Sequence, residues 1–278
     1  MSLGIRVHDI APGTLGERAA IAKQQGFGCV HLALSKTISP DYMTPTYATP
    51  GLASFVHSEL DGLDIAVLGC YLNPAHPDEQ EYQAILQKYF AHLRLCKWMG
   101  ADLVGTETGN PNAGYRYDPQ QSHTDESLEL FIQRVTPIVQ AAEKLGVTFA
   151  IEPVYTHIVS DAKRARRVLD HFSSPCFQII LDPVNLLHAD NIDRRDAVIE
   201  EAIELLGDDT AVIHIKDYQF IDGKVISVAA GTGEMDYTSI LKFATASKPH
   251  IHMTFEDTKP ENAEAARKHI QQLLDMAK

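Results

Sequence analysis

The feature of this sequence that most constrains its fold is an alternation of short apolar runs with longer amphipathic segments, repeated eight times. The apolar runs are typical of buried parallel strands, and they span Leu3–His8, Cys29–Leu34, Ile65–Tyr71, Leu103–Thr106, Val147–Glu152, Phe177–Asp182, Ala211–Lys216 and His250–Glu256. Helical patterns follow these runs, at Thr14–Gln25, Gly51–Asp61, Pro77–Met99, Asp125–Leu145, Asp161–Phe172, Arg194–Leu206, Tyr237–Ala246 and Glu261–Met276. The alternation predicts eight βα units.

Eight such units in a chain of 278 residues predict an α/β fold, a (β/α)8 TIM barrel that forms a single domain over residues 1–278. A doubly wound open sheet is the alternative. It is disfavoured because no phosphate-binding glycine fingerprint follows the first strand, and Gly231-Thr232-Gly233 does not lie in a strand-to-helix turn of that type. Long loops at Ile38–Pro50 and Gly109–Gln121 are expected to shape a binding site.

Charge and hydropathy exclude several classes of protein. The formal net charge of -13 argues against binding to nucleic acid, which needs a basic surface, and against an anionic membrane surface. No apolar run approaches the roughly 20 residues of a membrane span, and no signal peptide is apparent. The four cysteines show no CxxC spacing, which fits reduced thiols. We therefore expect a cytoplasmic protein without a nucleic-acid or membrane partner.

Four of the predicted strands in the second half of the chain end in a side chain of the type that binds metals. These side chains are Glu152, Asp182, His214 and Glu256. A single one of them is often a helix cap or an ion-pair partner, but the strand ends of a barrel meet at one mouth. Three carboxylates and an imidazole in one small volume repel one another unless a cation neutralises them. The sequence therefore predicts one divalent metal ion, and the sulfur-free ligand set suits Mn, Co, Zn or Mg, of which we favour Mn or Zn.

The residues around these strand ends resemble the xylose-isomerase-like TIM-barrel superfamily. The resemblance rests on Ile151-Glu152-Pro153, Leu181-Asp182-Pro183-Val184-Asn185, His214-Ile215-Lys216-Asp217 and Phe255-Glu256-Asp257. The sequence is most similar to the sugar phosphate isomerase/epimerase branch, which includes ketose 3-epimerases and inosose-processing enzymes. The similarity extends over essentially the whole chain and is strongest in the second half.

The resemblance implies specific roles for the four strand-end residues. All four would bind one divalent metal, and Glu152 and Glu256 would also be the catalytic acid/base pair. The implied activity is that of a metal-dependent sugar isomerase or epimerase, acting on a sugar, a sugar phosphate or a polyol-derived ketone by proton transfer through a cis-enediolate. A homodimer or homotetramer is also implied.

The sequence departs from the ketose 3-epimerases at two places. Those enzymes usually carry histidine three residues after the metal-binding aspartate, where this chain has Asn185 and only later His188. A second glutamate expected after Glu152 is absent, and Tyr155 and His157 occupy that region. These departures argue against ketose 3-epimerisation in particular and leave metal-assisted proton transfer in place.

Other polar residues near the strand ends are candidates for binding the substrate. They are Glu107, Asn185, His188, Lys216, Asp217, His157 and His8. A plain salt bridge is an equally good expectation for Lys216. His31 and His76 also lie near strand ends, but a lone histidine there is more often a packed core or loop residue.

Three alternatives to isomerisation stay open. An inosose-type dehydratase would use the same enediolate to expel a hydroxyl, so its product would lose the mass of water. An endonuclease-IV-like nuclease would need three zinc ions and further ligands, of which His8, His31 and Glu107 are a partial set, and the acidic charge argues against it. A non-catalytic sugar-binding barrel would have no need of both glutamates.

Overall fold

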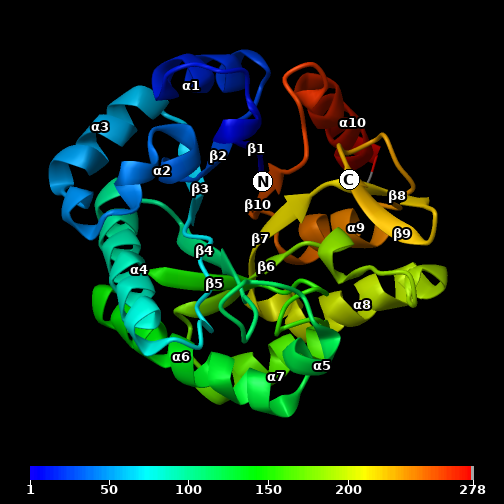
Figure 1. The fold of residues 1–278 in the computed structure, drawn as a ribbon. Coiled ribbons are helices and arrows are strands. Elements are labelled where there is room, and N and C mark those ends of the chain that lie inside the picture. Colours follow the sequence, from blue (N-terminus) through cyan, green and yellow to red (C-terminus); the bar gives the residue numbers. More distant parts are fainter. Residues whose placement is uncertain (277–278) are drawn as a thin grey trace.

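A closed barrel of parallel strands forms the centre of the computed structural model, which describes residues 1–276 (Figure 1). The strands follow the order β1-β10-β7-β6-β5-β4-β3-β2 around the barrel. They are β1 (Ser2–Arg6), β2 (Cys29–Leu32), β3 (Asp64–Gly69), β4 (Leu103–Glu107), β5 (Thr148–Glu152), β6 (Phe177–Leu181), β7 (Thr210–Ile215) and β10 (His252–Phe255). Pairing of β1 with β10, from Ser2 opposite His252 to Ile5 opposite Phe255, closes the barrel. The predicted (β/α)8 TIM barrel is confirmed, and the open-sheet alternative is wrong.

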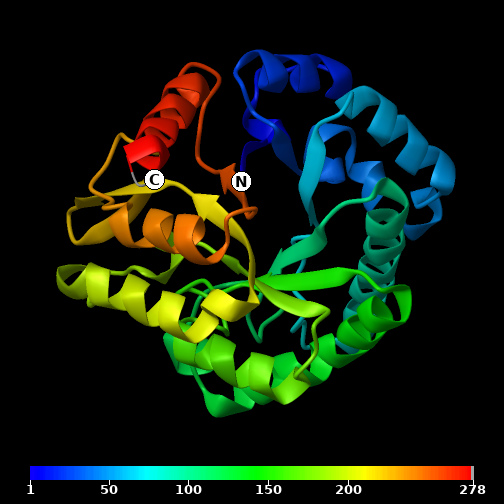
Figure 2. The same cartoon turned by 180° about the vertical axis from the view of Figure 1, so that it is seen from behind.

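Helices surround the barrel on its outside (Figures 1 and 2). The longer ones are α1 (Leu15–Gln24), α3 (Pro50–Leu60), α4 (Glu79–Met99), α6 (Asp125–Leu145), α7 (Ala162–Phe172), α8 (Arg195–Leu206), α9 (Thr238–Ser247) and α10 (Ala263–Met276). The side chains of Asp78, Thr124 and Asp161 accept hydrogen bonds from the first turns of α4, α6 and α7, as helix caps do. Gly100 and Gly146, both at φ +66°, end α4 and α6 in the left-handed conformation that glycine favours.

Two layers of apolar side chains fix the strands from either side. The larger core cluster lies between the strands and the helices. A smaller one fills the barrel interior and consists of Cys29, Ala66, Val67, Leu103, Ala150, Ile180 and Val212. Gly105 keeps the interior closely packed, because a Cβ there would lie 2.7 Å from side-chain atoms of both Ile180 and Val67. The strand ends above this filled interior are therefore held in fixed positions.

A β-hairpin that the sequence analysis did not predict follows β7. Strands β8 (Asp217–Ile221) and β9 (Lys224–Val228) form an antiparallel pair outside the barrel (Figure 1). Asp222 and Gly223 connect them with positive φ angles of 49° and 74°, and an Asp-Gly pair is a strong sequence signal for such a turn. No element was predicted for this segment, and each of the two strands is only five residues long.

All predicted boundaries of the eight strands and eight helices lie within two residues of the observed ones, and two of the differences bear on the site. His8 lies in a 3-10 turn (Val7–Asp9) rather than in β1, and β2 gives way at Leu34 to the short helix α2 (Leu34–Thr37). The long loop at 109–121 ends in another short helix, α5 (Pro119–Ser122). Among residues 1–276, no helix is both long enough and apolar enough to cross a membrane.

Candidate active site

The four predicted metal-type side chains converge at the carboxyl ends of neighbouring strands. Glu152, Asp182, His214 and Glu256 each place one ligand atom within 4.8 Å of those of the other three, and all four side chains are buried. Glu152 ends β5, Asp182 follows β6, His214 lies near the end of β7, and Glu256 follows β10. They meet because parallel strands of one barrel end at one mouth.

The imidazole of His214 lies between two of the carboxylates. Its Nδ1 is 3.2 Å from Oε1 of Glu152 and 3.4 Å from Oε1 of Glu256. Burial lowers the pKa of His214, but the negative charges of Glu256 and Glu152 outweigh burial and raise this pKa to about 9. In the absence of a metal ion, the imidazole is therefore held in its protonated form.

Two cationic side chains also reach the carboxylates. Nζ of Lys216 lies 2.9 Å from Oδ2 of Asp182 and 3.3 Å from Oε2 of Glu256. Nη1 of Arg6, from the end of β1, lies 3.3 Å from Oε1 of Glu256. Burial raises the pKa of Asp182 to about 6 against the opposing effect of Lys216. Burial also acts to raise the pKa of Glu256, yet His214, Lys216 and Arg6 hold it well below its usual value. The sequence analysis missed Arg6, and its one signal was a charge at the last position of a buried strand.

The donor set fits a divalent cation. The three carboxylates carry three negative charges, and Lys216 and Arg6 carry two positive ones. With a neutral His214 imidazole, the site as a whole therefore has a net charge of about one negative unit, which favours a cation. Among residues 1–276, the buried Nε2 of His214 has no hydrogen-bond partner, and Oδ2 of Asp182 pairs with the Lys216 ammonium. Oxygen and nitrogen donors without sulfur suit Mn²⁺, Co²⁺, Zn²⁺ and Mg²⁺ alike.

A pocket of about 190 Å³ opens beside Glu256, and two predicted substrate-binding residues line it. Its walls are Arg6, His8, His31, Ala33, Lys36, Tyr71, Glu107, Tyr115 and Glu256. His8 and Glu107 therefore face the space next to the metal-type cluster. His157 lies behind this wall, because its Nε2 is 3.8 Å from Oε2 of Glu107 and its ring packs against Tyr115.

Tyr115 belongs to the long loop after β4 and contacts Glu107 directly. Its hydroxyl donates a hydrogen bond of 3.1 Å to Oε2 of Glu107. Burial raises the pKa of Glu107, and the Tyr115 hydrogen bond opposes that shift. The long loop therefore supplies one aromatic side chain to the wall of this pocket.

Two of the predicted substrate-binding residues have geometries that do not fit that role. The ring of His188 stacks on Tyr155 at 3.6 Å between centroids and lines a separate cavity of about 260 Å³. The carboxylate of Asp217 is buried and accepts hydrogen bonds from four backbone N–H groups, those of Tyr218, Gly231, Gly233 and Met235. Asp217 organises the loop after the hairpin and has no oxygen directed at the pocket.

Asn185 and Lys216 contact the metal-type residues themselves. Asn185 donates a hydrogen bond of 2.6 Å from Nδ2 to Oε1 of Glu152. Lys216 forms the ion pairs described above, in line with the salt-bridge alternative that the sequence left open. Both residues are placed to position the carboxylates.

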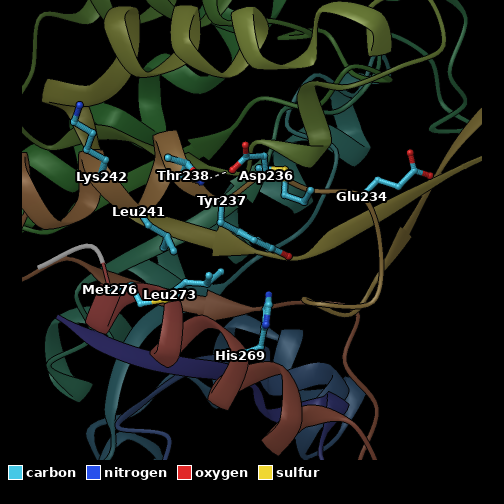
Figure 3. Close-up of a pocket in the computed structure, with 10 residues that line it drawn as sticks. Glu234, Asp236, Tyr237, Thr238, Leu241, Lys242, His269, Leu273 and Met276 are labelled. Atoms are coloured by element: carbon cyan, nitrogen blue, oxygen red, sulfur yellow. Dashed lines mark hydrogen bonds between the residues drawn. The ribbon is translucent and has the colours of Figure 1, made fainter.

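A larger groove of about 730 Å³ lies between α9 and α10, outside the barrel (Figure 3). Leu241, Leu273 and Met276 give it a largely apolar wall. Within residues 1–276, none of the four metal-type side chains contributes to this wall. The group of metal-type side chains therefore lies at the barrel mouth and not in the more voluminous groove.

Comparisons with known proteins agree with this architecture. A family model described as "Xylose isomerase-like TIM barrel" matches residues 19–277. No curated protein matches the sequence.

Several solved structures share the fold over nearly the whole chain. The 3-keto-D-glucoside 4-epimerase YcjR from E. coli has a TM-score of 0.77 at 16% identity, covering 98% of this chain and 99% of its own. A D-tagatose 3-epimerase-like protein has a TM-score of 0.78 at 13% identity, covering 100% and 98%. The IolI protein, solved with a bound zinc atom, has a TM-score of 0.73 at 17% identity, covering 100% and 96%. At these identities the likeness shows a common fold.

Proposed function

The chain belongs to the family of xylose isomerase-like TIM barrels, and from that premise we propose that it is a divalent-metal-dependent sugar or sugar phosphate isomerase or epimerase. The observation that carries the proposal is the buried group of Glu152, Asp182, His214 and Glu256, with ligand atoms within 4.8 Å of one another at the barrel mouth. Structures of the same fold include two named for sugar epimerases and one with bound zinc.

The pocket beside Glu256 supports a small polar substrate. Its volume of about 190 Å³ and its wall of charged, imidazole and phenolic side chains suit a small sugar or a polyol-derived ketone. The acidic net charge supports a small-molecule partner over nucleic acid.

The two glutamates are proposed as the proton carriers. A divalent cation held by the four residues would polarise the substrate carbonyl and stabilise negative charge on its oxygen. Glu256, kept ionised by the cationic groups around it, removes the proton from the carbon next to the carbonyl. Glu152, oriented by the Asn185 amide and protonated from solvent, gives its proton to the enediolate at the same or the neighbouring carbon, and Glu256 then releases the abstracted proton to solvent.

Solvent isotope exchange tests the acid/base pair. We expect the metal-reconstituted protein to incorporate deuterium from D₂O into one or more ketoses or inososes of a panel. Glu152→Gln and Glu256→Gln should each lower the exchange rate by about 10²- to 10⁴-fold, whereas Glu264→Gln, on exposed α10, should not. Unchanged exchange in both site variants would refute the acid/base assignment.

Elemental analysis tests the metal separately. We expect about one divalent ion per chain in the purified protein, lost when Asp182→Ala and His214→Ala are combined. If the wild-type protein binds no divalent ion even after reconstitution, the metal-dependent function is wrong.

An inosose-type dehydratase is the second candidate. It stays open because it would use the same enediolate, and the departures from the ketose 3-epimerases, Asn185 in place of histidine and the missing second glutamate after Glu152, argue only against 3-epimerisation. Mass spectrometry of the product separates the candidates, since isomerisation conserves mass and dehydration removes one water.

A further inference from the structure

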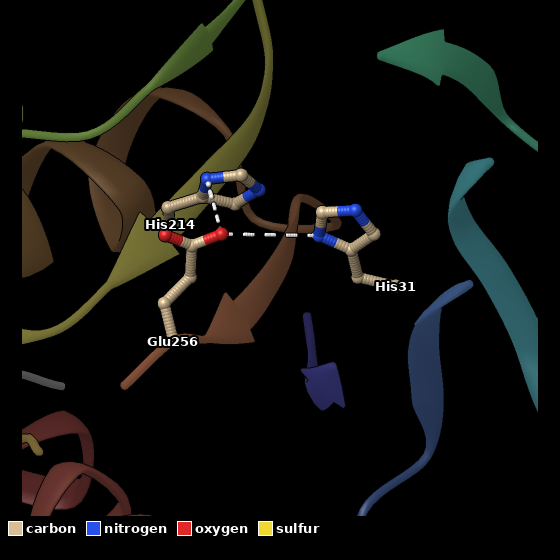
Figure 4. A group of neighbouring side chains, drawn as sticks. All are labelled: His31, His214 and Glu256. Carbon is tan, nitrogen blue, oxygen red and sulfur yellow. Dashed lines mark ion pairs between the residues drawn. The ribbon is translucent and has the colours of Figure 1, made fainter. Parts of the chain in front are cut away.

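A second group of metal-type side chains adjoins the first and includes a residue outside it. His31, from β2, joins His214 and Glu256 with ligand atoms within 4.8 Å of one another. The two imidazoles approach the same carboxylate oxygen (Figure 4). Nδ1 of His31 is 4.0 Å and Nδ1 of His214 is 3.4 Å from Oε1 of Glu256. The two rings are nearly parallel, at 18°, with centroids 5.4 Å apart.

The position of His31 leaves one of its nitrogen atoms without a partner. His31 is only 2% exposed, and its buried Nδ1 makes no hydrogen bond to any residue in the described range 1–276. If Nδ1 carries a proton, 4.0 Å is too long for a hydrogen bond to Glu256. If Nδ1 carries a lone pair, that lone pair faces a carboxylate oxygen. A cation between the two atoms satisfies both, and burying such polar atoms without a partner is costly.

The four-residue group does not include His31. The His31 ligand atom is therefore not within 4.8 Å of the ligand atoms of all four residues. Two donors that each lie about 2.1 Å from one ion are at most about 4.2 Å apart. A cation bound to all four residues does not also reach His31 in this arrangement. Neutral imidazole has a single lone pair, and His214 therefore binds one cation at a time. We call the site of the four-residue group the first position. A cation that binds at His31 and His214 therefore takes the place of the cation in the first position, and the two positions are not filled together.

We propose that His31, His214 and Glu256 form this second position for a divalent cation. Two imidazoles and one carboxylate leave open coordination positions, and His31 and Glu256 both line the 190 Å³ pocket, where substrate oxygens would complete the shell. The first position is rich in carboxylates, and the second is rich in imidazole. Nitrogen donors favour Zn²⁺ and Co²⁺ over Mg²⁺, so the second position takes the softer ions. This inference rests on the proposed function, because His214 and Glu256 also belong to the metal site proposed there.

Binding of Co²⁺ alone tests the second position. The double variant Glu152→Gln with Asp182→Asn disables the first position and leaves the second intact. We expect it to retain about one Co²⁺ per chain, with altered visible absorption because the donors differ. Adding His31→Phe should remove the bound Co²⁺ or weaken its binding by at least about tenfold. Adding His8→Phe instead, a histidine of the same pocket in neither group, should leave Co²⁺ bound.

Each other result has a distinct meaning. If the double variant loses Co²⁺ while the wild type binds it, the second position is refuted and the proposed function stands. If the double variant binds Co²⁺ equally with and without His31→Phe, the second position is also refuted. Wild-type protein that binds no divalent ion overturns both proposals. Circular dichroism shows whether each variant is folded, and His31→Asn replaces His31→Phe if the latter is not.

Discussion

Asn185 donates a hydrogen bond of 2.6 Å to Glu152, and this contact joins the turn after β6 to the end of β5. Asp182 holds that turn in place, because its Oδ1 accepts from the backbone N–H groups of Val184 and Asn185 at 2.9 and 3.1 Å. Its Oδ2 stays directed at Lys216. The Asp182 carboxylate therefore stabilises the turn through Oδ1 and contacts the site through Oδ2.

Replacing Asn185 should weaken cation binding without removing a ligand. Asn185→Leu deletes the donor that orients Glu152, and loss of a group that orients a metal ligand typically costs 10- to 100-fold in affinity or activity. Calorimetric titration with Mn²⁺ measures the effect. Asn191→Leu is the control, since the Asn191 amide donates only to a backbone carbonyl in the same segment. An equal affinity change in both variants would point to general disruption of the turn.

Removing Lys216 should destabilise the protein most when no metal is bound. Lys216→Met leaves Asp182 and Glu256 buried with less compensating charge, and breaking a buried pair in this way costs about 3–5 kcal/mol. A bound divalent cation supplies part of the missing positive charge. Urea denaturation with and without Mn²⁺ should therefore show a smaller loss in the presence of the ion. Equal losses under both conditions would argue that no cation lies among these carboxylates.

Substitution of Asp217 should affect the stability of the fold. Asp217→Ala leaves four backbone N–H groups without their acceptor, and hydrogen bonds to a charged group contribute about 1.5–3 kcal/mol each. We expect a loss of at least about 3 kcal/mol, with Asp217→Asn in between because it retains one acceptor oxygen. Thermal and urea unfolding measure this. If Asp217 bound substrate instead, Asp217→Ala would raise KM and leave the unfolding free energy unchanged.

Buried His92 should make the protein less stable in acid. This side chain on α4 is 1% exposed, and burial lowers its pKa against the effect of the Lys88 carbonyl. Below about pH 6.5 the unfolded state binds the proton and the folded state does not, so stability falls as pH falls, by up to about 1.4 kcal/mol per pH unit for each such proton. His92→Leu should flatten this dependence below pH 6.5 and leave it unchanged at pH 8, where neither state is protonated. Identical slopes would contradict the assignment.

The barrel and the four metal-type residues were predictable for the same reason. Fully buried parallel strands give continuous apolar runs, and an acidic or imidazole side chain at the end of such a run stands out from its surroundings. Once β5, β6, β7 and β10 are placed in one barrel, the convergence of Glu152, Asp182, His214 and Glu256 follows from topology. Their roles in binding metal and moving protons remain predictions.

The residues that the sequence did not reveal, or to which it pointed in another role, owe their positions to three-dimensional neighbours. Arg6 ends β1, but only the pairing of β1 with β10 brings it to Glu256. His31 was set aside as an isolated histidine, and its significance comes from His214 and Tyr71, whose rings stack on it at 5.4 Å. Asp217 belongs to the same sequence motif as His214. Its carboxylate accepts hydrogen bonds from four backbone N–H groups, and three of these donors come from the loop after the hairpin, whose path the sequence does not reveal. The hairpin itself had a local signal in Asp222-Gly223.

The pairing of β1 with β10 has a consequence for how the protein assembles. Arg6 ends the first strand of the barrel and Glu256 follows the last one, so the contact between them spans almost the whole chain and carries a high loop-closure cost. A chain still emerging from the ribosome can form the earlier βα units, but it lacks Glu256 until the final strand is made. If the proposed metal site is correct, the protein can bind the ion only after the barrel has closed, and cation binding would then report completed folding.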